Sequence, residues 1–164
     1  MKNKSPKEIA LSVVNKLNLP VFPCKENKTP FTKNGFKSAT KDPDAVNNFW
    51  NRFPKALIGV PTGKISGLFV IDIDEGKNKS GEDNFKNLGF NEPDTIQTFT
   101  QNKGRHIIFQ FDQTLPQKST TGTLFGKNID TRGEGGYVIW AGSKGYVYKE
   151  GYGPDDKKIS PIPE

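Results

Sequence analysis

The run from Gly67 to Asp74 constrains the fold more than any other part of the sequence. Four consecutive apolar residues, Leu68 to Ile71, predict a strand with both faces buried, because side chains alternate between the two faces of a strand. Such a strand lies inside a sheet that has protein on both sides. The run ends in Asp72-Ile73-Asp74, so two carboxylates stand where the buried strand comes to its end.

Three helices are predicted from capping residues and from the spacing of apolar residues. Ser5 can cap a first helix that runs to about Asn18. A second helix is predicted to begin after Asp42 and must stop before Pro54, because proline cannot continue a helix. Residues 81–88 predict a third, shorter helix.

Apolar segments separated by turn residues predict further strands. Thr95–Thr100 and Arg105–Phe111 are expected to form a hairpin. A second hairpin is expected from Asn128–Arg132 and Tyr137–Ala141, joined by the glycine-rich residues 133–136. The remaining predicted strands are Leu57–Val60 and an edge strand, Tyr146–Tyr148.

Asp72 and Asp74 occupy positions i and i+2 of the predicted strand, so both side chains point to the same face. Two adjacent carboxylates repel each other, and their place at the end of an apolar strand is costly unless a cation compensates. Oxygen ligands of this kind suit Mg²⁺ or Mn²⁺. The alternative is a solvated strand end that continues into the polar residues 75–80, and so short a pattern leaves both interpretations open.

A third carboxylate, Asp130, lies in the predicted strand Asn128–Arg132, with Arg132 on the same face. If this strand neighbours the first, the three aspartates form a cradle for two metal ions, which stabilises the attacking and leaving oxygens of phosphoryl transfer. The alternative is a surface ion pair between Asp130 and Arg132, which contributes little to stability. The sequence alone does not place Asp130 beside Asp72.

His106 is the single histidine of the chain and begins a predicted strand. Gly104 permits a close approach of the backbone, and Lys103 and Arg105 add positive charge. This combination favours a nucleoside triphosphate site, with Lys103, Gly104, Arg105, His106 and Arg132 as the expected binding residues. The alternative is a histidine with a structural role, which is the more common case for a lone histidine.

Composition narrows the class of protein. The chain has 164 residues, enough for one domain with one core, and its formal net charge of +6 favours polyanionic partners such as nucleic acid. The single cysteine, Cys24, excludes an internal disulfide framework and a cysteine-rich zinc site. No signal peptide or membrane span is recognisable, so we expect a cytoplasmic protein.

Several blocks of the sequence resemble, in their order and spacing, the bifunctional DNA primase/polymerase N-terminal (prim-pol) domain of the archaeo-eukaryotic primase superfamily. The blocks are Gly35–Thr40, Ile58–Gly63, Gly67–Asp74, Gly104–His106 and Ile129–Val138. The resemblance implies an α+β fold: an archaeo-eukaryotic primase-like catalytic core with an RRM-like sheet, plus an N-terminal α/β unit. We expect residues 1–150 to form this catalytic domain and residues 151–164 to be a C-terminal tail or linker.

The resemblance also implies roles for single residues. Asp72 and Asp74 match the first acidic metal motif of the family, and Asp130 matches the carboxylate of the third motif. His106 matches the nucleotide-binding histidine. These four are the expected catalytic residues, with one or two Mg²⁺ or Mn²⁺ ions held by the aspartates. The family often has two glycines before the histidine, and Lys103 replaces the first of them here.

The activity implied by the resemblance is DNA-templated nucleotidyl transfer, by a primase/polymerase of a plasmid, phage or mobile element. The expected partners are a single-stranded DNA template and primer, nucleoside triphosphates, and a helicase or helical accessory domain outside this sequence. Two alternatives stay open: an Asp-x-Asp nucleotide-sugar transferase, which needs no template, and an RRM-like nucleic-acid-binding module without catalysis. A rolling-circle nuclease is excluded, because it needs a pair of histidines.

Overall fold

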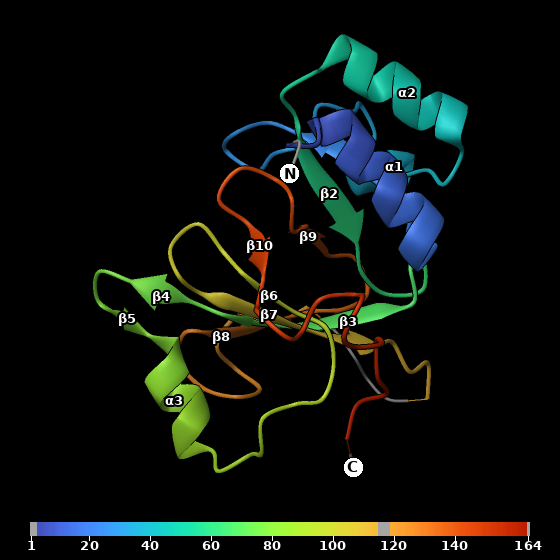
Figure 1. Ribbon diagram of the computed structural model, residues 1–164. Coiled ribbons are helices and arrows are strands. Elements are labelled where there is room, and N and C mark those ends of the chain that lie inside the picture. Colours follow the sequence, from blue (N-terminus) through green and yellow to red (C-terminus); the bar gives the residue numbers. More distant parts are fainter. Residues whose placement is uncertain (1–2, 115–118, 164) are drawn as a thin grey trace.

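A computed structural model describes residues 3–114 and 119–163, which form two layers (Figure 1). The first layer consists of α1 (Pro6–Leu17), β1 (Phe22–Cys24), the 3-10 helix η1 (Gly35–Ser38), α2 (Pro43–Arg52), β2 (Leu57–Pro61) and β9 (Tyr137–Ile139). The second layer consists of β3 (Leu68–Ile73), β4 (Glu75–Gly76), β5 (Lys79–Ser80), α3 (Gly81–Asn87), β6 (Gln97–Phe99), β7 (Arg105–Gln110), β8 (Ile129–Arg132) and β10 (Val147–Tyr148). The fold is therefore of the α+β class.

The two larger sheets are antiparallel throughout the described residues. The first layer has the strand order β1-β2-β9, and the second has the order β10-β6-β7-β3-β8. β3 therefore has a neighbour on each edge, and both ladders run along its length. This central place is the one that the unbroken apolar run of β3 predicts.

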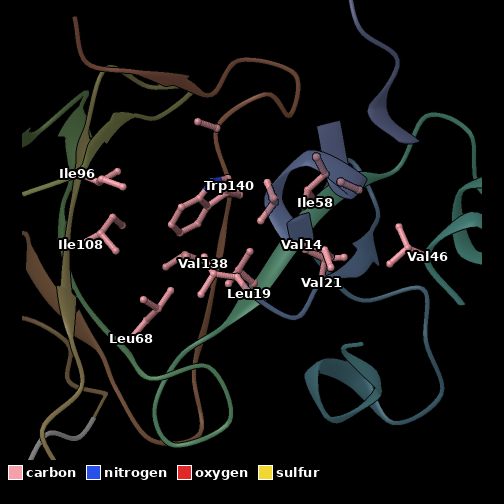
Figure 2. Packing of buried hydrophobic residues seen from close by; sticks show 14 of the residues in the cluster. Val14, Leu19, Val21, Val46, Ile58, Leu68, Ile96, Ile108, Val138 and Trp140 are labelled. Atoms are coloured by element: carbon pink, nitrogen blue, oxygen red, sulfur yellow. The ribbon is translucent and has the colours of Figure 1, made fainter. Parts of the chain in front are cut away.

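The two faces of β3 pack against two different hydrophobic cores, which confirms that both faces of this strand are buried. Leu68 and Val70 face the first layer and pack in one cluster with Val138 and Trp140, as Figure 2 shows for part of this cluster. Phe69, Ile71 and Ile73 point the other way and pack with Phe85 of α3. Their alternation fixes which side of the sheet the following residue, Asp72, must face.

The helices begin and end where their capping residues predict. Ser5 and Glu8 form a capping box at the start of α1, and Asn18 closes that helix in the left-handed region. Asp42 caps α2 by accepting a hydrogen bond from the Asp44 N–H, and α2 ends at Arg52, before Pro54. Within residues 3–114 and 119–163, no helix has the length and apolar character needed to cross a membrane.

The first predicted hairpin and the predicted edge strand are confirmed, but the second hairpin is wrong. β6 pairs with β7, and β10 pairs with β6 at the edge of the sheet. β8, however, pairs with β3 in the second layer, whereas β9 pairs with β2 in the first. The glycine-rich residues 133–136 carry the chain from one layer to the other, and the Thr62 hydroxyl fastens them by donating to the Gly133 carbonyl at 2.6 Å.

The segment after Gly151 also differs from the expected tail or linker, because it packs on the second layer. The Gln97 N–H donates to the Tyr152 carbonyl at 3.1 Å, and the Gln110 N–H donates to the Ser160 carbonyl at 2.9 Å. Ile159 packs against the core between the two layers, and Ile162 packs against the core on the other face of the second layer. Main-chain hydrogen bonds hold much of this segment. Because nearly every residue type can form such bonds, the sequence carries no pattern that predicts this packing.

Candidate functional site

The register of the five-stranded sheet places four polar side chains in one row. Asp72 on β3 lies directly opposite His106 on β7 and, across its other edge, directly opposite Asp130 on β8. Thr98 on β6 lies opposite His106 and extends the row. Opposed residues share one face of a sheet, and this face is turned toward the first layer. The strand pairing thus answers what the sequence left open, because Asp130 lies beside Asp72.

Asp72 is the centre of a charged network within this row. Its Oδ1 lies 3.3 Å from Nε2 of His106, and its Oδ2 lies 3.5 Å from the guanidinium of Arg132. The same guanidinium nitrogen lies 3.4 Å from Oδ2 of Asp130. Burial acts to raise the pKa of Asp72, but His106, Arg132 and Lys28 outweigh it and hold the pKa below its ordinary value. Asp72 is therefore a carboxylate at neutral pH.

Asp74 lies just beyond the end of β3, on the same face as Asp72. Burial raises the pKa of Asp74, the negative charges of Asp72 and Asp130 raise it further, and Lys79 at 3.7 Å opposes the rise. The three carboxylates are thus close enough to repel one another. Such repulsion is an excess of negative charge that a bound cation relieves.

The three aspartates fit a divalent cation by the chemistry of their donors. They offer oxygen atoms alone, which is the ligand preference of Mg²⁺ and Mn²⁺. Arg132 now bridges Asp72 and Asp130 and offsets part of their charge. Within the described parts of the chain, no three His, Cys, Asp or Glu side chains are already arranged around a common metal position. Metal binding at these aspartates would therefore require their side chains to shift.

His106 is almost fully buried, with an exposed fraction of 5%. Its Nε2 faces Asp72, whereas its Nδ1 has no hydrogen-bond partner among the described residues. Leaving a buried polar atom without a partner costs about 1–3 kcal/mol. The ring centroid lies 6.4 Å from that of Tyr146, which forms part of the surroundings of the histidine. One nitrogen of the ring is thus occupied, and the other has capacity for a further hydrogen bond.

A cleft of about 500 Å³ opens between the two layers at this row. This volume is within the range of small-molecule sites, about 300–1,000 Å³. The second layer contributes polar groups to the walls, among them Asp72, Asp74, His106, Arg132 and Lys79. The first layer contributes aromatic and apolar groups, among them Phe36, Tyr137 and Ile139. The cleft therefore has charged side chains on the side of the second layer and, on the side of the first layer, aromatic side chains that suit a flat ring.

Lys28 is a cleft residue that the sequence did not single out. It comes from the loop after β1, where its φ of +73° and a hydrogen bond of 2.9 Å from the Tyr137 hydroxyl to its carbonyl set its position. Its ammonium lies 6.0 Å from the centre of the Tyr146 ring and contributes to the lowered pKa of Asp72. Many lysines lie in this loop region, so composition alone could not distinguish Lys28 from its neighbours.

The structure does not bring Arg105 to the cleft. Because it precedes His106 on the same strand, Arg105 faces the opposite side of the sheet, where Glu82 lies at 2.7 Å and Glu92 at 2.6 Å. Gly104 has a different reason for being glycine, since a Cβ there would lie 2.4 Å from the Ile73 carbonyl oxygen. Lys103 is exposed in the β6–β7 turn with a φ of +64°. These three residues shape the hairpin and the far core, whereas His106 and Arg132 line the cleft.

These observations define an α+β domain with a nucleotide-sized cleft between two layers, lined by both carboxylates and cations. The model of one family, Prim-Pol, described as "Bifunctional DNA primase/polymerase, N-terminal", matches residues 10–164. The chain belongs to this family. Membership suggests DNA primase/polymerase activity, a nucleotidyl transfer that acts on DNA and nucleotides. A search of curated proteins finds no match.

Proposed function

We propose that this cleft catalyses DNA-templated nucleotidyl transfer, with Asp72, Asp74 and Asp130 as ligands of one or two Mg²⁺ or Mn²⁺ ions. The observation that carries the proposal is the strand register, in which Asp72 has His106 on one side and Asp130 on the other. When bound, such an ion polarises phosphate oxygens and activates the attacking hydroxyl. The raised pKa of Asp74, caused by burial and by the other two carboxylates, supports a role in cation binding.

The other cleft residues bind and orient the nucleotide in this proposal. His106, which lines the cleft beside Asp72, contacts a phosphate oxygen of the nucleotide. Arg132 and Lys28 supply positive charge to the same triphosphate. The aromatic wall that contains Phe36 and Tyr137 packs on the base. Each role uses a group that lines the cleft, which is why Arg105 and Lys103 have none.

The proposal extends to the type of core, the origin of the protein, its location and its partners. The contiguous antiparallel strands β6, β7, β3 and β8, with α3 on one face, support an RRM-like core. A replication protein of a plasmid, phage or mobile element is proposed from the family resemblance. The cytoplasmic location and the helicase or helical accessory partner rest on the sequence and on that resemblance alone.

A nucleic-acid-binding module without catalysis is the second candidate, and one observation favours it. Arg132 already bridges Asp72 and Asp130 at 3.5 and 3.4 Å, so the carboxylates are partly neutralised without a metal. Such a module would bind nucleic acid and leave divalent ions unbound. Metal binding therefore separates the two candidates before any activity is measured.

The first experiment is a titration of metal-free protein with Mn²⁺, followed by thermal unfolding. A site among the three aspartates stabilises the fold by about 1.4 kcal/mol when free Mn²⁺ reaches ten times its dissociation constant. The Asp72→Asn, Asp74→Asn double variant should lose this stabilisation, whereas Glu150→Gln, an exposed carboxylate elsewhere, should keep it. Equal stabilisation of the double variant would refute the metal assignment and favour the binding module.

The second experiment is primer extension on a DNA template, with Mg²⁺ or Mn²⁺ and with each nucleotide type in turn. We expect the primer to grow only in the presence of template and divalent ion. Transfer that ignores the template would indicate a nucleotide-sugar or terminal transferase instead. The same assay shows whether deoxynucleotides or ribonucleotides are preferred.

A further inference from the structure

A second hollow, of about 530 Å³, lies in the first layer between the loop after β1 and the end of α2. Two phenylalanines, Phe31 and Phe53, and several cationic side chains line it. Cys24 lies beneath the surface here, and burial raises its pKa to about 12, so it is a protonated thiol rather than a nucleophile. The hollow therefore offers rings and positive charge, and no catalytic group.

The two rings form a fixed stacked pair. Their centroids lie 4.1 Å apart and their planes meet at 14°, so they are nearly parallel. The Phe31 N–H donates to the Pro23 carbonyl at 3.0 Å, and the Phe53 N–H donates to the Phe49 carbonyl at 2.8 Å. Despite this anchoring, the Phe31 side chain is 36% exposed. Because hydrogen bonds fix the main chain at Phe31, its exposed ring can stack on a ligand without the loop having to become ordered first.

Cations surround the ring pair. The Lys25 ammonium lies 5.8 Å from the Phe31 ring centre, and the Arg52 guanidinium carbon lies 5.3 Å from the Phe53 ring centre. Lys55 and Lys144 add two further positive charges to the walls. Among the described residues that line the hollow, Glu26 is the one carboxylate, and it pairs with Lys144 at 3.3 Å. The surface therefore carries a clear excess of positive charge next to exposed rings.

The hollow and the proposed catalytic cleft are bordered by the same two short loops. Residues 25–31 reach both, because Lys28 lines the cleft while Phe31 lines the hollow. Residues 144–146 also reach both, because Tyr146 lines the cleft and Lys144 lines the hollow. A polymer that leaves the cleft across these loops meets the ring pair within a few residues.

We propose that this surface, made of Phe31, Phe53, Lys25, Arg52 and Lys55, binds the single-stranded part of the nucleic acid that occupies the cleft. Exposed rings stack on bases without regard to sequence, and cations beside them contact the phosphates, which is the combination that single-strand-binding proteins use. The inference rests on the proposed function, because it takes the occupant of the cleft to be a nucleic acid. Binding at this surface itself needs no metal and no catalysis.

The test is the fluorescence anisotropy of a labelled oligothymidylate, with full-length protein, a metal chelator and a series of salt concentrations. Phe31→Ala should weaken binding by about tenfold, the order expected for loss of one base–ring stack. Lys55→Gln, at a fully solvated position, should reduce the slope of log affinity against log salt by about 0.7, as expected for one lost phosphate contact on a single strand. The matched controls are Phe90→Ala and Lys86→Gln, which alter an exposed ring and an exposed lysine near α3.

The controls should bind as the unaltered protein does. Unchanged affinity in Phe31→Ala together with an unchanged salt slope in Lys55→Gln would overturn the proposal. Thermal unfolding identifies any loss that comes from misfolding of Phe31→Ala, and in that case the Lys55→Gln slope decides the matter alone. Asp72→Asn should retain oligothymidylate binding. Failure of the unaltered protein to extend a primer, together with normal, Phe31-dependent binding, would reject the proposed function and leave this surface standing.

Discussion

Two charged clusters lie on opposite faces of the same sheet, and they differ in how far neighbouring groups compensate their charges. Arg105 and His106 are neighbours on β7, and each is 5% exposed. Arg105 has Glu82 and Glu92 at 2.7 and 2.6 Å and donates to Gln97 at 2.8 Å, and its guanidinium lies over the Phe85 ring. On the other face, Asp72, Asp74, His106 and Arg132 line an open cleft, and Asp130 lies beside Asp72 on the neighbouring strand.

The difference teaches how to separate a structural ion cluster from a functional one. The Arg105 cluster is closed, since its cation has carboxylates, an amide oxygen and a ring around it. The Asp72 cluster is open, because it lines the cleft and because burial and mutual repulsion raise the pKa of Asp74. A closed cluster stabilises the fold, whereas an open one has unused capacity for a ligand.

The largest expected effect concerns the open cluster and is on activity. Asp72→Asn keeps the size of the side chain and removes the charge from the centre of the row, so primer extension should fall by at least about 100-fold. The fold should persist with somewhat lower stability, because the variant loses the attraction of His106, Arg132 and Lys28 that lowers the pKa of Asp72. Extension rates and thermal unfolding measure the two quantities on the same preparation, with Glu150→Gln as the control. Normal extension by Asp72→Asn would show that the open cluster is not the catalytic one.

The closed cluster should give the reverse result. Arg105→Gln leaves Glu82 without its cation and Glu92 with Lys149 alone, and it should lower the free energy of unfolding by about 2–3 kcal/mol. This is below the value for a fully buried pair, because both carboxylates are partly exposed. Extension per folded molecule should stay unchanged at a temperature where the variant is folded. Urea unfolding and extension assays test the two statements. A loss of nucleotide affinity in folded Arg105→Gln would restore Arg105 to the nucleotide site.

The effect of His106 on nucleotide binding should be smaller than either of these. His106→Ala should weaken the binding of a nucleoside triphosphate by about tenfold, the value of one lost hydrogen bond to a charged group. Binding of a DNA oligonucleotide should change much less, because the nucleic acid contacts a wider surface. Titrations with each ligand compare the two effects, and Thr98→Ala, the neighbour in the same row, reports the cost of disturbing the sheet. Equal weakening for both ligands would point to a structural histidine.

Local pattern predicted much of this arrangement. The apolar run before Asp72 predicted the central strand, period-two alternation predicted that Asp72 and Asp74 share a face, and the cap at Ser5 predicted where α1 begins. Each of these inferences depends on residues within one element. They need no knowledge of which segment lies beside which.

What the sequence could not predict depends on pairing between distant segments. Residues 128–132 were expected to pair with 137–141, yet β8 and β9 lie in different layers, because the glycine-rich residues between them permit a crossing as readily as a turn. Arg105 was expected beside His106 at a phosphate site, and its carboxylate partners come from α3 and the following loop. Lys28 reaches the cleft because it adopts the left-handed backbone conformation itself, and the composition of the loop does not predict this conformation.

The smallest expected effect concerns the pH dependence of stability, and it contrasts two members of the open cluster, Asp72 and Asp74. Burial and the charges of Asp72 and Asp130 raise the pKa of Asp74, so ionised Asp74 opposes folding at neutral pH, and this opposition fades as pH falls through the raised pKa. The lowered pKa of Asp72 has the opposite sign, because burial is outweighed by His106, Arg132 and Lys28. Its stabilisation is present above the ordinary aspartate pKa and is lost as pH falls through the lowered one.

Asp74→Asn should therefore raise the free energy of unfolding at pH 7 by a few tenths of a kcal/mol, a small value because Asp74 is partly solvated. The gain should shrink toward acid pH, where Asp74 in the unaltered protein becomes neutral. Urea unfolding in the presence of a chelator measures both limits, and saturating Mn²⁺ should reverse the order of stability, since the unaltered protein alone keeps every ligand. A destabilised Asp74→Asn at pH 7 without metal would mean that Lys79 outweighs the repulsion, and that the cluster has no excess of negative charge for a cation to relieve.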